Sequence, residues 1–235
     1  MSLSILEPHA YDADMARKIS DSDAAASARK QEKQDARRRE IIRASRDLFF
    51  EASFDNVSIR DLEKATGLTR GAIYYYFENK EDIYGAVVIE GLERVRNLLL
   101  EASGAHMGDP KAQLVAIYRA LAEHYFQERQ IFDNLLRYFF GMRPTATLSA
   151  QLLQDTEDQV RMTQSIVEGI IAAGNDSGVF DCDDPEFAGM AIWGVYVTMI
   201  QMAGDNERLR AVSRPRKVLV KQLEEHILHI VGARS

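Results

Sequence analysis

Apolar residues recur along most of this chain at the three- and four-residue spacing of amphipathic helices. In the first such segment Ile41, Ile42, Leu48 and Phe49 share one face, while the neighbouring arginines lie mostly elsewhere. The pattern predicts a helix that ends near Ser53.

Two short helices are expected next, because capping residues and a glycine interrupt the sequence. Ser58 has the side chain of an N-cap, and Asp61 stands three residues later, where it can complete a relative of the capping box. Gly67 ends this second helix. Thr69 is the next N-cap candidate, and it opens a third helix that runs to about Tyr76.

A fourth helix begins after Asn79 and extends to about Ala102, with acidic residues in its first turn, where the helix dipole favours them. Breaks that contain glycine or proline separate the later helices, which are expected at residues 110–128, 131–141, 146–173, 184–204 and 214–231. The sequence contains no evident pair of strands with a hairpin turn. The chain is therefore expected to be all-α, with about nine helices.

These elements divide the chain into three expected parts. Residues 1–33 have few large apolar side chains and are expected to form a mobile leader, residues 34–80 hold the first three helices, and residues 81–235 form a larger helical bundle. The 235 residues and the 46% hydrophobic composition suffice for a real apolar core.

The charge is distributed unevenly between these parts. The chain as a whole carries a formal net charge of −7. Residues 29–46, however, contain eight basic side chains and only three acidic ones. A basic N-terminal portion joined to an acidic body suggests two different tasks on one chain.

Several classes of protein are disfavoured by features that the sequence lacks. Cys182 is the only cysteine, so neither an internal disulfide nor a cysteine metal cluster is possible, which fits a reducing cytoplasm. No run approaches the roughly 18 consecutive apolar residues of a membrane helix. Charged residues also occupy the N-terminus, where a signal peptide needs an apolar run. We therefore expect a cytoplasmic protein with no membrane partner.

The second and third helices have the spacing of a helix-turn-helix unit. Leu62, Leu68, Ile73 and Phe77 supply its apolar anchors, which leaves residues 69–72 as an exposed leading turn. A recognition helix needs this arrangement, because its first turn must enter the major groove of DNA.

The side chains of the third helix suit contact with a duplex. Gly71 and Ala72 are small enough to allow close approach to base edges, and Arg70 can bind guanine or a phosphate. Tyr74 and Tyr75 lie about 100° and 200° around the helix from the inward-facing residue 73. Their hydroxyls can therefore reach phosphate oxygens at the groove wall.

Further cations flank this unit. Lys80 precedes the fourth helix, where its ammonium and the helix dipole both favour phosphate. Arg38 and Arg39 on the first helix are also expected to contact phosphate. For the basic residues 29–33 of the leader, a minor-groove arm and a tail without function remain alternatives.

Residues 58–62 (SIRDL) and 66–81 (TGLTRGAIYYYFENKE) resemble the DNA-binding signature of the tetracycline-repressor (TetR) family of bacterial regulators. The resemblance spans about residues 38 to 88. It implies a homodimer in which the last two long helices form a four-helix interface, and it implies that the central helices enclose a ligand cavity.

The resemblance also implies roles for single residues. Arg60 and Arg70 match positions used for groove or phosphate contacts. The full set of candidate DNA-binding residues is Arg38, Arg39, Ser58, Arg60, Thr69, Arg70, Gly71, Ala72, Tyr74, Tyr75 and Lys80. Two positions depart from the family pattern: Glu63 stands where a small residue is usual, and Ser53 replaces a glycine. Glu63 leaves the crossing of the two motif helices open.

Aromatic and methionine side chains are frequent in the expected bundle, where they can fill a core or frame an apolar cavity. The candidate ligand-binding residues are Tyr138, Phe139, Trp193 and Tyr196. His226 and His229 are three apart on the last helix, which permits metal binding but suits an interface or a solvent position better. We expect no cofactor and no metal site.

Together these patterns predict a ligand-responsive transcriptional regulator, and most simply a repressor. It would bind a near-palindromic DNA operator as a homodimer and be released by a small apolar or aromatic effector. An enzyme is not expected, because the sequence has no nucleophile elbow, phosphate-binding glycine loop or HExxH motif. The alternatives are a helical small-molecule carrier or enzyme whose N-terminal unit only docks, and a non-specific DNA-compacting protein.

Overall fold

A computed structural model describes residues 9–52, 54–129, 132, 133, 136, 148–202 and 214–234, with side chains from residue 24 onward except that of residue 50. Regular structure in these ranges consists of eight α-helices and one short 3-10 helix, which confirms the all-α expectation. Within the same ranges, no helix combines the length and the apolar character that a membrane span requires.

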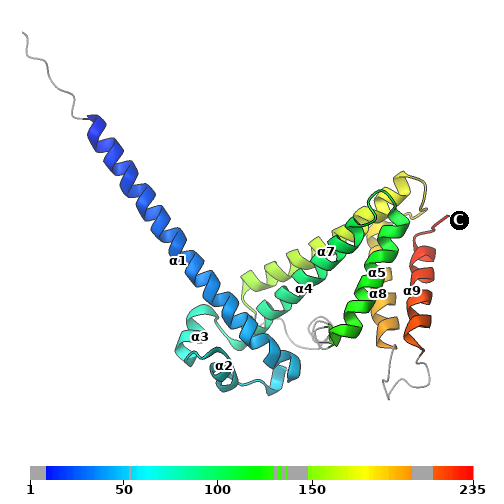
Figure 1. The fold of residues 1–235 in the computed structure, drawn as a ribbon, viewed down its shortest axis with the longest axis horizontal. Coiled ribbons are helices and arrows are strands. Elements are labelled where there is room, and N and C mark those ends of the chain that lie inside the picture. Colours follow the sequence, from blue (N-terminus) through cyan, green and yellow to red (C-terminus); the bar gives the residue numbers. More distant parts are fainter. Residues whose placement is uncertain are drawn as a thin grey trace, which may run out of the picture.

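The N-terminal part is a three-helix unit, seen at the lower left of Figure 1. It consists of α1 (His9–Glu51), the 3-10 helix η1 (Phe54–Asn56), α2 (Ile59–Thr66) and α3 (Arg70–Tyr76). The leader expected at residues 1–33 is thus helical from His9 onward. Its shortage of large apolar residues did not forbid a helix, because alanine, arginine, lysine and glutamine are strong helix formers.

The capping residues predicted for α2 and α3 are confirmed. The Ser58 hydroxyl accepts a hydrogen bond from the Asp61 N–H (3.3 Å), and the Ser58 N–H donates to the Asp61 carboxylate (3.1 Å), so the capping box is complete. Gly67 ends α2 with a positive φ of 67°, which a glycine adopts without strain. Thr69 accepts from the Ala72 N–H (3.3 Å) and so caps α3.

The core of the three-helix unit combines residues from every helix. Ile41 and Phe49 of α1 and Leu62 of α2 are buried with Ile73 and Phe77, which lie in and just after α3. The anchoring role predicted for Leu62, Ile73 and Phe77 is confirmed. These contacts fix the orientation of α3 relative to the rest of the unit.

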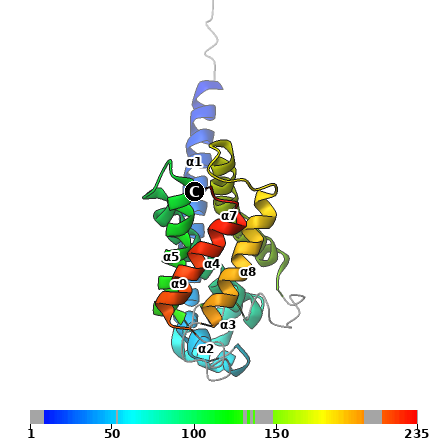
Figure 2. The same ribbon diagram turned by 90° about the vertical axis from the view of Figure 1, so that its right-hand side faces the viewer.

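The bundle contains α4 (Lys80–Gly104), α5 (Pro110–Gln127), α7 (Ala150–Asp176), α8 (Pro185–Gln201) and α9 (Arg216–Ile230). Helix α4 runs out of the three-helix unit and packs against α5 and α7, while α9 packs against α5 and α8. Figure 2 shows α8 and α9 together on one face of the bundle. The helix expected at residues 131–141 lies largely outside the described residues.

Helix α4 also holds the three-helix unit against the bundle. The Tyr84 ring meets the Phe49 ring edge-on at 5.2 Å between centroids. Glu90 accepts from Arg46 of α1 (3.3 Å) and from Arg94 one turn further along α4 (2.6 Å). The three-helix unit and the first half of α4 are therefore joined by both apolar and ionic contacts.

Candidate nucleic-acid interface and ligand cavity

The first turn of α3 lies exposed on the surface of the three-helix unit. Thr69, Arg70 and Gly71 are exposed and Ala72 is partly exposed, while Ile73 is buried beneath them. Helix α3 has only seven residues and is capped at its start by Thr69. A short, capped helix that is anchored from one side presents its leading turn outward, as a major-groove reader must.

Arg70 and the tyrosines extend this exposed face. The Arg70 guanidinium lies 5.4 Å from the centroid of the Tyr74 ring, a cation–π arrangement that holds both side chains on the surface. Tyr75 is 66% exposed, and its hydroxyl accepts a hydrogen bond from the Gln34 amide of α1 (2.8 Å). The phenolic proton of Tyr75 is left to donate to another acceptor. Tyr76 packs against the hydrophobic core and contacts the Tyr75 ring edge-on.

Glu63 has a role that the sequence analysis missed. Its carboxylate accepts a hydrogen bond from the backbone N–H of Arg70 at 2.7 Å, so a side chain of α2 bonds the first residue of α3. A carboxylate at a helix N-terminus is also favoured by the helix dipole. The residue that departs from the family pattern therefore fixes how α2 meets α3. Its only sequence signal was that departure.

Lys80 is expected from the sequence to bind phosphate, whereas in the structure its ammonium is hydrogen-bonded to the protein itself. Its ammonium donates to the carbonyl oxygens of Phe54 (3.0 Å) and Val57 (2.8 Å) and lies 4.1 Å from the centroid of the Phe54 ring. Burial lowers the pKa of the Lys80 ammonium, and the nearby Glu81 carboxylate opposes that change. Two of its three N–H donors thus close the η1 segment onto the start of α4, and a phosphate contact stays a prediction for the third.

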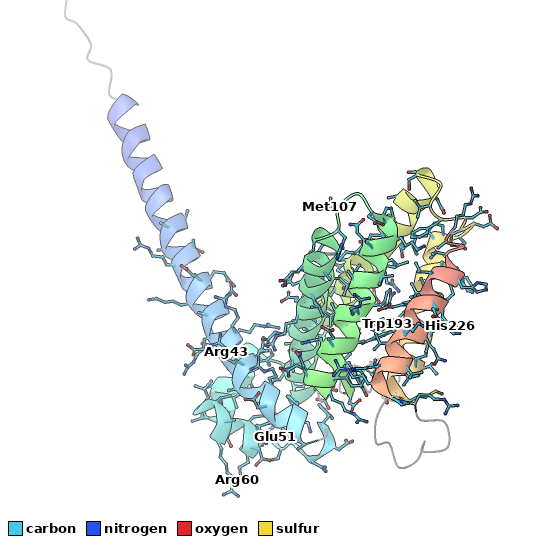
Figure 3. The ribbon with its side chains drawn as sticks, turned by 45° about the vertical axis from the view of Figure 1, so that its right-hand side comes forward. Arg43, Glu51, Arg60, Met107, Trp193 and His226 are labelled. Carbon is cyan, nitrogen blue, oxygen red and sulfur yellow. The ribbon has the colours of Figure 1, made fainter. Side chains whose placement is uncertain are left out.

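The remaining candidate residues differ in how freely they can reach a duplex. Arg39 and Arg60 are exposed, and Figure 3 shows Arg60 projecting from the three-helix unit away from the bundle. The Arg38 guanidinium lies 4.6 Å from the centroid of the Phe77 ring and is only partly exposed. Ser58 is exposed, but its hydroxyl also donates to Asp61 (2.6 Å). That hydrogen bond and the one from the Ser58 N–H lower the pKa of the Asp61 carboxyl.

A cavity of about 330 Å³ lies in the bundle among α4, α5, α7 and α8, in the size range of small-molecule sites. Its described lining is mostly aliphatic and aromatic, with Thr163 and Gln164 of α7 as polar members. The lining residues are Leu92, Val95, Leu99, Tyr118, Leu121, Phe132, Leu136, Val160, Thr163, Gln164, Val167, Gly189 and Trp193. The arrangement suits an apolar molecule with a small number of hydrogen-bonding groups.

The four predicted ligand-binding residues differ in how they lie relative to this cavity. Trp193 lines the cavity and is 36% exposed at its edge. Tyr196 does not line it: the side chain is fully buried, and its hydroxyl donates to the carbonyl oxygen of Leu121 (3.0 Å). Tyr196 therefore supports the wall behind Trp193, with 5.4 Å between ring centroids. Tyr138 and Phe139 lie outside the described residues.

Most of the lining was not predicted, because aliphatic residues of a cavity wall have the same periodicity as core residues. Tyr118 is one of the aromatic residues of the bundle, but nothing in the sequence distinguished it from a core residue. Thr163 and Gln164 are polar positions beside the apolar stripe of α7, and this polarity was a further sequence signal that the sequence analysis did not use. The Nδ1 atom of His226 lies 2.6 Å from the carbonyl oxygen of Gln222 in the same helix. The described residues contain no group of three or more side chains that could hold a metal ion.

The chain was compared with known proteins in sequence and in structure. Residues 41–87 match the family model described as bacterial regulatory proteins of the tetR family, and residues 107–201 match the tetracyclin repressor-like C-terminal domain. The HTH-type transcriptional repressor Rv1474c of Mycobacterium tuberculosis is 40% identical over 60 residues, which are 26% of this chain and 32% of that repressor. The chain thus spans about a third of the length of this relative.

Solved structures share the fold over most of the chain. A bacterial regulatory protein of the tetR family from Rhodococcus RHA1 superposes with a TM-score of 0.65 at 20% identity, over 85% of this chain and 98% of that one. The RolR protein in complex with resorcinol gives a TM-score of 0.61 at 20% identity, over 87% and 91% of the two chains. With the matches in both parts, the chain belongs to the tetR family of bacterial regulatory proteins.

Proposed function

We propose that this protein is a transcriptional repressor that binds a DNA operator as a homodimer in the cytoplasm and releases it when a small molecule enters the bundle. It performs no catalysis in this scheme. The observation that carries the proposal is the exposed leading turn of α3, which is capped by Thr69 and stabilised by Glu63 above a buried Ile73. A carrier or an enzyme has no need of such a surface.

The homodimer is supported by the outward face of the last helices. Phe187 and Met190 of α8 are 63% and 51% exposed, and Val218 of α9 is 43% exposed. Exposed apolar side chains of this size mark surfaces that a partner covers. A symmetric dimer places two copies of α3 in successive major grooves about 34–36 Å apart, so its operator is a near-palindrome.

The effector is proposed to be a small apolar or aromatic molecule in the cavity beside Trp193. The predominantly apolar lining supports this class of compound. The fold neighbour RolR was solved with resorcinol, a small aromatic diol. For the effector to release DNA, it must bind more tightly to a conformer in which the two α3 helices are wrongly placed than to the DNA-binding conformer.

The proposal is tested by selecting DNA from a random pool with the purified protein and sequencing the bound fraction. We expect one near-palindromic motif, bound by two protomers and protected in a footprint against excess random competitor. Binding without a common motif would indicate DNA compaction instead. Catalytic turnover of a small molecule without any DNA binding would favour the enzyme.

A further inference from the structure

Helix α1 extends well beyond the three-helix unit that its C-terminal half helps to build. It begins at His9, whereas Ile41 is the first buried side chain among those described from residue 24 onward. All described side chains from residue 24 to residue 33 are exposed. Figure 1 shows the extension projecting past α3, and the 25 residues that precede Gln34 measure about 37 Å as a helix. Such a helix gains little from packing on its own chain.

The part of the extension nearest the three-helix unit carries a basic face. At 100° per residue, Arg29, Lys30 and Lys33 fall within about 100° of the helix circumference. Asp35 lies on the opposite side of the helix, where it accepts a hydrogen bond from Gln31 (3.0 Å), whereas Glu32 borders the basic arc about 60° from Arg29, on the side away from Gln34. Within residues 29–35 the basic arc therefore holds three cations and no acidic side chain, with Glu32 at its border.

A contact with α3 sets the position of this basic face. Gln34 borders the basic arc and donates a hydrogen bond to the Tyr75 hydroxyl (2.8 Å). Tyr75 is the most exposed aromatic residue of α3, on the surface assigned to the wall of the major groove. The three cations thus begin within one helical turn of a residue that faces the sugar-phosphate backbone. Arg37, on the same face, is paired with Glu40 and is left out of the set.

We propose that Arg29, Lys30 and Lys33 form a second DNA-binding surface, which neutralises backbone phosphates beside the base pairs covered by α3. The partner of this surface is duplex DNA, because its phosphates complement three neighbouring cations on an exposed helix. The inference rests on the proposed function and adds to it a longer contact with each half-site. Because the contact involves phosphates alone, it strengthens binding without changing the preferred sequence.

The test compares the wild-type protein with the triple variant Arg29→Gln, Lys30→Gln and Lys33→Gln on two DNA fragments. One fragment is the shortest that retains the selected motif, and the other carries ten further base pairs on each side. Glutamine keeps the helix propensity of α1 close to that of arginine and lysine, and circular dichroism checks it. A second triple variant, Arg119→Gln, Arg129→Gln and Arg161→Gln, removes the same charge from exposed positions of the bundle outside α8 and α9.

We expect the wild-type protein to bind the flanked fragment more tightly than the short one, and the α1 variant to lose that difference. For each α1 extension bound, the salt dependence of log K on the flanked fragment should be shallower by about 2.7, so the affinity lost between 50 and 200 mM salt is ~40-fold smaller. The control variant of the bundle should behave as the wild type. Equal salt slopes for the wild-type protein and the α1 variant would overturn the inference while leaving the operator intact. Failure of the wild-type protein to bind either fragment would instead overturn the proposed function.

Discussion

Arg70 has two competing uses on a DNA surface, base recognition and phosphate neutralisation, and its surroundings favour the first. Its backbone N–H is bonded to Glu63, and its guanidinium lies over the Tyr74 ring. A guanidinium that lies over an aromatic ring keeps its in-plane N–H groups for a bidentate partner, such as the O6 and N7 atoms of guanine. The residue is thereby oriented before DNA arrives.

Arg70→Ala should weaken binding to the selected operator by ~1–3 kcal/mol, because a bidentate base contact is lost. Binding to random DNA should change much less, since phosphate contacts by other residues remain. Fluorescence anisotropy at one salt concentration measures both affinities. Arg161→Ala, at an exposed position of α7, serves as the control. An equal loss of affinity on operator and random DNA would assign Arg70 to a phosphate.

The hydrogen bonds of Lys80 to backbone carbonyl oxygens are expected to stabilise the fold of the three-helix unit. Lys80→Met should remove the ammonium that donates to the carbonyl oxygens of Phe54 and Val57, and we expect the free energy of unfolding to fall by ~1–3 kcal/mol. Urea denaturation measures this loss, and salt titration of operator binding provides the comparison. Unchanged stability together with a salt slope shallower by about 0.9 would show that its main partner is a phosphate.

At the scale of the elements, the short helices were predictable because their signals are local. Ser58 with Asp61, Gly67 and Thr69 act within a few residues of their own positions, and each lies in the structure as its residue type requires. The bond from Arg70 to Glu63 spans seven residues and depends on the angle between two helices. No pattern in a single sequence supplies that angle.

The same distinction explains the other differences between sequence and structure. The hydrogen bonds of Lys80 reach back 26 and 23 residues, and the cavity wall combines residues of four helices with Phe132 and Leu136 from between α5 and α7. The extension of α1 back to His9 was not predicted, for another reason. Hydrophobic periodicity identifies a helix that packs, whereas residues 24–33 are helical and exposed on all sides.

Glu63→Ala should loosen the junction between α2 and α3, because the Arg70 N–H loses its acceptor at the start of the recognition helix. We expect faster hydrogen exchange at the Arg70 amide, a loss of ~0.5–2 kcal/mol in stability of the unit, and weaker operator binding. Glu63→Gln retains a carbonyl acceptor and should lie close to the wild type. If both substitutions leave the exchange rate of the Arg70 amide unchanged, the Glu63 bond does not hold α3 in solution.

At the scale of the whole molecule, α4 connects the cavity to the DNA-binding surface. It begins at Lys80, shortly after α3 ends, and it lines the cavity with Leu92, Val95 and Leu99. Near its start, the buried Asp82 carboxylate accepts from the Ser149 N–H beside the first turn of α7 (2.9 Å). Helix α7 forms another wall of the same cavity. A ligand that displaces α4 from α7 therefore acts on the element that carries the three-helix unit.

Trp193 is the only tryptophan of the chain and lies at the cavity edge, so its fluorescence reports occupancy of the cavity. N-phenyl-1-naphthylamine, a neutral aromatic probe, should accept energy from Trp193 on binding. The probe should lower operator affinity about 5- to 150-fold, the range of typical allosteric coupling.

Gly189→Leu should abolish both effects of the probe while leaving operator binding unchanged in its absence. An added Cβ at Gly189 lies in ordinary contact with Val167 and Glu168, at 3.8 Å, so the larger side chain must extend into the cavity. Gly169→Leu, at an exposed position of α7 where a Cβ meets nothing within 4 Å, should respond to the probe as the wild type does.

Because coupling is reciprocal, operator DNA must weaken probe binding by the same factor by which the probe weakens operator binding. Probe binding that persists in the Gly189→Leu variant, or two unequal factors in the wild type, would place the probe's effect on DNA outside this cavity.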